Sequence, residues 1–171
     1  MGEAIVADDH ITTRRGGSGT YKHGDDLPPG SVFGRYVIEE KIGKGGMGIV
    51  YAAKDPTLNR RVALKVVTID ATDRDPQAHS RILREAQAMA QISHPNLVTV
   101  FEVGRLNQAV YIAMEYVDGL TLRKWIVAEK RSWKEILSVF TLAARGLQET
   151  HRLDLVHRDF KPDNVMVDKL G

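Results

Sequence analysis

The chain has 171 residues with 24 basic and 22 acidic side chains, and its formal net charge of +2 is too mild to suggest a nucleic-acid-binding protein. It contains no cysteine, so disulfides and thiolate metal sites are excluded. No apolar run approaches the roughly 18 residues of a membrane-spanning helix, and two aspartates interrupt the N-terminus before a secretory core could form. We therefore expect a cytoplasmic globular protein with no membrane segment in this chain.

Residues 1–31 are predicted to be a flexible leader. The stretch ITTRRGGSGTYKHGDDLPPG mixes glycine, charge and a Pro-Pro pair, and it shows no period of 2 or 3.6 residues. Thr12 and Thr13 stand beside two arginines, which is one pattern of a phosphorylation site. A solvated linker with incidental threonines is the simpler interpretation.

Residues 32–117 are predicted to form a compact antiparallel lobe of five strands with one inserted helix. The segments VFGRYVIEEKI, IVYAAKD and RRVALKVVTI have strand character, and KGGMG is a glycine turn between the first two. A helix is expected from about Pro76 to Ser93, where HPN stops it. The segments LVTVFEVGRL and AVYIAMEYV complete the sheet as a hairpin that turns through Asn107 and Gln108.

From residue 118 onward the pattern becomes helical. A short helix is expected over 122–127. A longer one begins at Ser132, because SWKE has the Ser-x-x-Glu spacing of a capping box, and it ends near His151. Its apolar stripe consists of Ile136, Val139, Phe140, Ala143 and Leu147. The segment HRDFKPDN is predicted to follow as a loop.

The glycine-rich segment IGKGGMGIVY suggests a phosphate site. Gly43, Gly45 and Gly48 fit a dinucleotide fingerprint, a phosphate-covering hairpin or an ordinary glycine turn. A dinucleotide fingerprint needs a helix after the glycines, whereas IVYAAKD has strand character. A glycine hairpin lets backbone N–H groups approach phosphate oxygens without interference from Cβ atoms. Val50 would then lie under the turn and cover a purine.

Lys65 in VALKVV lies within an otherwise apolar strand, where a lysine on a half-exposed face would be ordinary. The two-residue alternation puts Ala63 on the same face, and Val50 joins that face across the hairpin. An ammonium there needs a counter-charge, and we expect Glu85 to supply it from the apolar stripe of the predicted helix. That stripe also contains Ile82, Met89 and Ile92. The alternative is that Glu85 lies at the edge of the stripe and pairs with a nearby arginine.

The loop HRDFKPDN gathers three polar side chains. Asp159 can accept a proton, Lys161 can neutralise a transferring phosphoryl group, and Asn164 can offer an amide oxygen to Mg²⁺. Taken alone, the segment would more simply be an Asp/Asn/Pro turn with ordinary capping contacts.

Taken together, five elements occur in the order found in the protein kinase family: IGKGGMGIV, VALK, Glu85 within RILREAQAMAQISHPNLV, MEYVDG and HRDFKPDN. The sequence resembles that family over about residues 36–167. HRD followed by Lys161 resembles the serine/threonine branch, and GGMGIVYAAKDPTLNRRVALK is most similar to bacterial members of the eukaryotic-like class. The resemblance implies an α+β, protein-kinase-like fold with a five-stranded N-lobe and an incomplete helical C-lobe.

The resemblance also implies a reaction, transfer of the ATP γ-phosphoryl group to Ser or Thr hydroxyls of a protein substrate, with autophosphorylation as one case. Lys65 would hold the α- and β-phosphates while Glu85 orients it. Asp159 would position the substrate hydroxyl and accept its proton, Lys161 would be the second catalytic residue, and Asn164 would bind Mg²⁺.

The other positions that the resemblance assigns surround the nucleotide. Met114 matches the gatekeeper, and Arg158 resembles the arginine that pairs with a phosphorylated activation loop in many kinases. The remaining expected ATP contacts are Ile42, Gly43, Lys44, Gly45, Gly46, Met47, Gly48, Val50, Ala63, Glu115, Val117 and Met166.

The sequence contains no DFG segment, whose aspartate is the principal Mg²⁺ ligand of the family. VMVDKLG resembles the first strand of the hairpin that precedes DFG. We therefore expect residues 118–171 to be the start of the C-lobe, truncated before DFG, and the chain to lack appreciable kinase activity. We also expect the stripe of the 132–151 helix to be left partly uncovered. The alternative is a natural short form that acts as a non-catalytic nucleotide-binding or interaction module.

Overall fold

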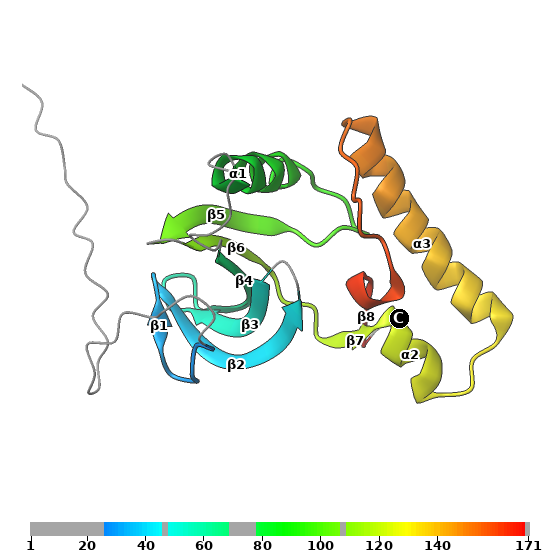
Figure 1. Cartoon of the computed structure of the whole chain (residues 1–171). Helices are drawn as coiled ribbons and strands as arrows, with labels where there is room; N and C mark the ends of the chain where they lie inside the picture. The colour runs from blue at the N-terminus through cyan, green and yellow to red at the C-terminus, as the bar shows by residue number, and fades with distance from the viewer. Residues whose placement is uncertain (1–25, 46–47, 69–77, 107–108, 170–171) are drawn as a thin grey trace, which may run out of the picture.

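The protein is described by a computed structural model over residues 26–45, 48–68, 78–106 and 109–169. Its N-terminal part is a curled, six-stranded antiparallel sheet with strand order β1-β2-β3-β4-β6-β5 (Figure 1). The strands are β1 Val32–Phe33, β2 Tyr36–Gly45, β3 Gly48–Asp55, β4 Arg60–Thr68, β5 Val100–Leu106 and β6 Ala109–Glu115.

The sheet has one strand more than the five that the sequence predicts. The predicted first strand is divided, because Gly34 takes a φ of 60° and turns the chain back so that Phe33 pairs with Tyr36. The predicted 97–117 hairpin is present and pairs Leu106 with Ala109, although its turn residues lie outside the described ranges. The expected α+β architecture is therefore confirmed, with the strand count corrected from five to six.

The three α-helices are α1 Ala78–Met89, α2 Leu122–Ala128 and α3 Trp133–Arg152. The predicted start of the first helix, Pro76, lies outside the described residues. The capping box predicted at Ser132 is confirmed: its hydroxyl accepts a hydrogen bond from the Glu135 N–H at 3.3 Å, and the Glu135 carboxylate accepts one from the Ser132 N–H at 2.8 Å. Within the described ranges, no helix combines the length and apolar character needed to span a bilayer.

The hydrophobic core lies inside the curl of the sheet. Tyr51 and Leu64, opposite each other on β3 and β4, are almost fully buried there. Leu27 is also buried, and its N–H donates a hydrogen bond of 3.0 Å to the Tyr51 hydroxyl. Packing against the sheet therefore begins before residue 32, where the predicted leader ends, while residues 1–25 of that leader lie outside the described ranges.

A polar cluster around Glu102 closes the curl by joining β2 to β5 and β6. The carboxylate accepts hydrogen bonds from the Tyr36 hydroxyl at 2.8 Å and the Tyr111 hydroxyl at 2.6 Å, and it pairs with Arg35. Burial alone would raise the pKa of Glu102, but these two hydrogen bonds and the guanidinium outweigh it and lower the pKa. The Tyr111 hydroxyl, half-buried beside that carboxylate, has its pKa raised to about 12.

We predict that this cluster makes the fold acid-sensitive. Because the pKa of Glu102 is lower in the folded than in the unfolded state, its contribution is complete above the unfolded pKa and is lost as the pH falls through the folded pKa. Glu102→Gln should lower the free energy of unfolding by about 1–3 kcal/mol at pH 7 and make it fall less steeply below about pH 4.5, as urea titrations at several pH values would show. Glu129→Gln, on an exposed side chain, is the matched control. An unchanged acid slope in Glu102→Gln would contradict the assignment.

A two-stranded antiparallel ribbon connects the end of the sheet to the last described residues. It consists of β7 Gly119–Thr121 and β8 Met166–Asp168, which pair Leu120 with Val167. The Leu122 N–H continues this pairing by donating to the Val165 carbonyl at 2.7 Å, and the Leu122 side chain is fully buried. The ribbon contacts α2 (Figure 1) and holds both ends of the segment 119–168 together.

Helix α3 packs closely on the loop after α1 at Gly146. A Cβ atom at Gly146 would lie 2.5 Å from the Asn96 carbonyl oxygen, so only glycine allows this approach. The opposite end of the helix is open: Trp133 and Leu137 are 69% and 55% exposed, and a hollow of about 440 Å³ runs beside them. The expected partial exposure of the α3 stripe is confirmed, since Phe140 is 37% exposed.

Candidate active site

The predicted nucleotide-facing side of the sheet is assembled by strand register. Val50 on β3 pairs with Lys65 on β4, and Ala63 on β4 pairs with Met114 on β6. Partners across an antiparallel pair share a face, so these four side chains lie together as the alternation predicts. Ala63 is buried, while Val50, Lys65 and Met114 are half-buried. Two apolar side chains from other elements remain open to solvent, Ile42 at 46% and Met166 at 40% exposure.

The glycine-rich turn joins β2 to β3, with Gly45 and Gly48 as the last described pair; Gly46 and Met47 lie outside the described residues. Gly48 has a φ of 119°, and a Cβ atom there would lie 2.3 Å from the Val66 carbonyl oxygen. This glycine is therefore required by its contact with β4. A Cβ at Gly45 would meet nothing within 4 Å, and one at Gly43 would meet only Val50 at 3.9 Å, so both leave room for a ligand.

The backbone leaves the sheet between Glu115, the last residue of β6, and Val117. The Glu115 N–H donates to the Thr99 carbonyl at 2.9 Å, and the Glu115 carboxylate accepts a bond from the Thr99 N–H at 3.3 Å. Among the described residues, by contrast, the backbone groups of Val117 have no hydrogen-bond partner. Lys44, on the glycine turn, lies 3.9 Å from the Asp26 carboxylate.

Lys65 lies on β4 and is half-buried. Its ammonium makes no hydrogen bond or ion pair with any described residue. Burial lowers the pKa of Lys65, and the negative charge of Asp159 opposes that shift. The charges of two residues 94 positions apart in sequence, 159 − 65, therefore influence each other.

The predicted Lys65–Glu85 ion pair is not formed. Glu85 is 53% exposed and pairs with Arg158, whose Nη1 lies 3.4 Å from Oε1. Of the α1 side chains that the structure describes, Ala86 is the buried one, while Glu85 and Met89 of the predicted stripe are exposed, so the inward face is turned by about one residue, or 100°, from that stripe. The alternative interpretation, an edge position with an arginine partner, is the one that holds, although the arginine comes from the HRD loop and not from the helix.

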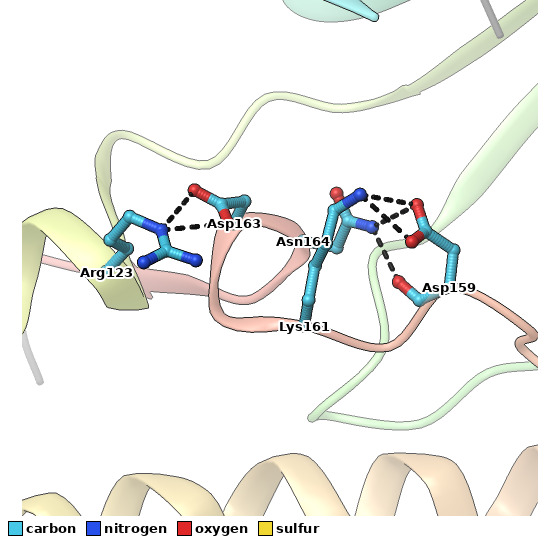
Figure 2. Close-up of polar contacts among 5 residues, drawn as sticks. All are labelled: Arg123, Asp159, Lys161, Asp163 and Asn164. Atoms are coloured by element: carbon cyan, nitrogen blue, oxygen red, sulfur yellow. Dashed lines mark hydrogen bonds and ion pairs between the residues drawn. The ribbon is translucent and has the colours of Figure 1, made fainter. Parts of the chain in front are cut away.

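The loop places its three predicted polar groups in contact (Figure 2). The Lys161 ammonium lies 2.9 Å from both carboxylate oxygens of Asp159. The Asn164 amide nitrogen donates to the Asp159 main-chain oxygen at 2.7 Å and to its carboxylate at 3.0 Å. These bonds, from Lys161 first and Asn164 second, lower the pKa of Asp159. The carboxylate is therefore ionised at neutral pH, and the Asn164 amide oxygen is left without a hydrogen bond to the described residues.

One contact of this loop was not predicted from the sequence. The Nε of Arg123, on α2, donates to both carboxylate oxygens of Asp163 at 2.7 and 2.9 Å (Figure 2). Nothing in the local pattern indicates it, because Arg123 is an exposed helix residue 40 positions away. Within the described ranges, no cluster of three or more His, Cys, Asp or Glu side chains forms a complete metal site.

A curled antiparallel sheet with one helix, joined through a short ribbon to a His-Arg-Asp loop, defines the fold class of the protein kinases. A family model described as "protein kinase domain" matches residues 36–171, and the chain therefore belongs to the protein kinase family.

Similar proteins agree with this membership. The serine/threonine-protein kinase PrkC of Bacillus subtilis is 38% identical over 141 residues, which are 82% of this chain and 22% of PrkC. A probable serine/threonine-protein kinase of Clostridium acetobutylicum is 43% identical over 134 residues, 78% of this chain and 20% of the relative. The crystal structure of the PknI kinase domain of Mycobacterium tuberculosis matches with a TM-score of 0.72 at 30% identity, over 84% of this chain and 58% of that chain. The chain thus spans about a fifth of the length of PrkC and of the Clostridium kinase, and 58% of the PknI kinase-domain chain.

We predict that the pKa of the Lys65 ammonium depends on the charge of Asp159 and not on that of Glu85. Asp159→Asn removes the charge that opposes desolvation, so the pKa of Lys65 should fall further and its neutral fraction at a given pH should rise. The rate at which an amine-reactive reagent labels Lys65, followed by peptide mass spectrometry from pH 7 to 11, should shift to lower pH. Glu85→Gln is the control and should leave the profile in place. A shift in the control as large as in Asp159→Asn would contradict the geometry.

Proposed function

We propose that this chain carries the ATP site and catalytic loop of a serine/threonine protein kinase, which transfers the γ-phosphoryl group of ATP to Ser or Thr hydroxyls of proteins, its own included. The observation that carries the proposal is the contact of Asp159 with Lys161 and Asn164 in one loop, where the charge of Asp159 also acts on the half-buried Lys65. A reaction of this kind requires a cation for phosphates and an ionised acid for a hydroxyl in one site. A cytoplasmic location suits a protein that consumes ATP.

The residues present fit Mg²⁺–ATP. Lys65 is a half-buried cation that lacks a side-chain partner within the described structure, so phosphate oxygens would relieve its desolvation. The Asn164 amide oxygen, which no described residue bonds, is a ligand type that Mg²⁺ accepts, and Mg²⁺ commonly takes few protein ligands beside substrate phosphates. Val50, Ala63 and Met114 offer an apolar surface for the base. When bound, Mg²⁺–ATP supplies the transferable phosphoryl group and the charge that neutralises it.

The loop residues divide the remaining tasks. Asp159 stays ionised because Lys161 and Asn164 both bond to it, so it can accept a hydrogen bond from an incoming hydroxyl and take its proton. Lys161, already 2.9 Å from that carboxylate, brings positive charge to the place where phosphoryl charge is transferred. Arg158 holds Glu85 in this arrangement, and Lys65 therefore acts without a carboxylate from α1.

We further propose that these 171 residues by themselves do not catalyse phosphoryl transfer. They contain no DFG aspartate, and the loss of a principal Mg²⁺ ligand removes both positioning and charge neutralisation. ATP binding should accordingly be weak, and the alternative of a non-catalytic nucleotide-binding module would give the same result in this chain.

Two measurements on the purified chain test these proposals. A thermal-shift titration with Mg²⁺–ATP should raise the melting temperature slightly, and Lys65→Met should weaken the binding about tenfold or more, because a charge-assisted contact is lost. Transfer of radiolabel from γ-labelled ATP to a protein substrate should be undetectable. No stabilisation by ATP at millimolar concentration would overturn the nucleotide site. Transfer that disappears in Asp159→Asn would overturn the inactivity.

A further inference from the structure

The catalytic loop is tethered to the rest of the structure by very few polar side chains. Its single-turn 3₁₀ helix, η1 Pro162–Asn164, has no buried residue, and Lys161 at its N-cap makes no side-chain capping bond. Within the described ranges, only two ion pairs between side chains link residues 157–164 to other elements. Arg158 pairs with Glu85 on α1, and Arg123 on α2 pairs with Asp163. The turn also lies against α2 and β7, but it buries no side chain, so these ion pairs contribute to holding it in place.

The two pairs are not equivalent. The Arg158–Glu85 contact is long, at 3.4 Å, and joins side chains that are 73% and 53% exposed. The Arg123 Nε bonds both oxygens of Asp163 at 2.7 and 2.9 Å, and Arg123 directly follows Leu122, which is fully buried and bonded to Val165 through its backbone. The backbone that carries the Arg123 guanidinium is therefore held in place.

Asp163 and Asn164 are consecutive and point to opposite sides of the turn. In Figure 2, Asp163 faces Arg123, while Asn164 faces Asp159, to which its amide nitrogen donates two hydrogen bonds of 2.7 and 3.0 Å. Rotation of the turn about its axis would break both sets of contacts together. Holding Asp163 thus fixes the direction in which the Asn164 amide points.

We propose that Arg123 is a positioning residue of this active site: through Asp163 it orients Asn164, and so presents the Asn164 amide oxygen to Mg²⁺. The inference rests on the proposed function for its metal, but the orientation of Asn164 is a property of the chain alone. An exposed ion pair contributes little to global stability, so the effect is expected on the site and not on folding.

The first test follows the Asn164 side-chain amide by NMR in the full chain without nucleotide. In the parent protein its two N–H resonances should be distinct and protected from exchange with water, because the nitrogen is bonded to Asp159. Arg123→Gln and Asp163→Asn should each collapse this protection, the double variant should be no worse than either single one, and Arg123→Lys should restore part of it. Unchanged protection in both single variants overturns the proposal, and backbone spectra and melting temperatures show whether each variant is folded.

The second test separates positioning from simple charge. The gain in ATP affinity on adding Mg²⁺ is measured by titration with and without the metal. Loss of a nearby cation would by itself increase the attraction of Mg²⁺, so a pure charge effect predicts a larger gain in Arg123→Gln. Positioning predicts a smaller one, on the order of tenfold, as for other residues that orient metal ligands. Lys124→Gln, one residue along α2, removes the same charge without a loop contact and is the control.

The outcomes distinguish the two proposals. If Mg²⁺–ATP fails to bind the parent chain, the proposed function fails, while the exchange measurement still decides the role of Arg123. If binding is normal and Arg123→Gln shows the same or a larger Mg²⁺ gain than Lys124→Gln, the positioning role is overturned and the proposed function stands.

Discussion

The pairing of residues 119–122 with 165–168 is the constraint on which the site depends. Three strand pairs of the ribbon and the bond from the Leu122 N–H to the Val165 carbonyl close a segment of nearly fifty residues, including α3 and the whole catalytic loop. Since Leu122 is fully buried, that closure is anchored in apolar packing as well as in hydrogen bonds. The turn of the loop is thereby held against α2 and β7. Without this ribbon, Asp159 would have no fixed relation to Lys65.

The charges of Lys65 and Asp159 and of their neighbours determine the electrostatics of the site. Burial lowers the pKa of Lys65, and the negative charge of Asp159 opposes that shift. The ionised form of Asp159 is itself stabilised by hydrogen bonds from Lys161 and Asn164. The carboxylate is thus bonded within its own loop, and the Lys65 ammonium forms no ion pair with a residue that the structure describes. Glu85 does not satisfy it, because Arg158 takes that carboxylate. In the site we propose, a polyphosphate would supply the negative charge that Lys65 lacks among the described residues.

How much of this could be predicted from the sequence depends on the range of each interaction. Alternation along β3 and β4 was sufficient to put Val50, Ala63 and Lys65 on one face, because a strand has only two faces. The Ser132 capping box was equally local. The predicted partner of Glu85 was wrong, because an error of one residue in the phase of the helix turns a side chain by about 100°. The β7–β8 ribbon and the Arg123–Asp163 pair join residues 40 or more positions apart and leave no periodic signal, so only the structure reveals them.

The most direct test of the account asks whether one bound triphosphate reaches both parts of the site at once. Mn²⁺–ATP, added in small amounts to isotopically labelled chain, broadens the NMR signals of amides close to the metal. The account predicts that the amides of the glycine turn near Gly43 and Gly45, of Lys65 and of Asp159–Asn164 broaden together, and that exposed amides of α3 do not. Broadening confined to the loop or to acidic surface positions, with the sheet unaffected, would contradict it.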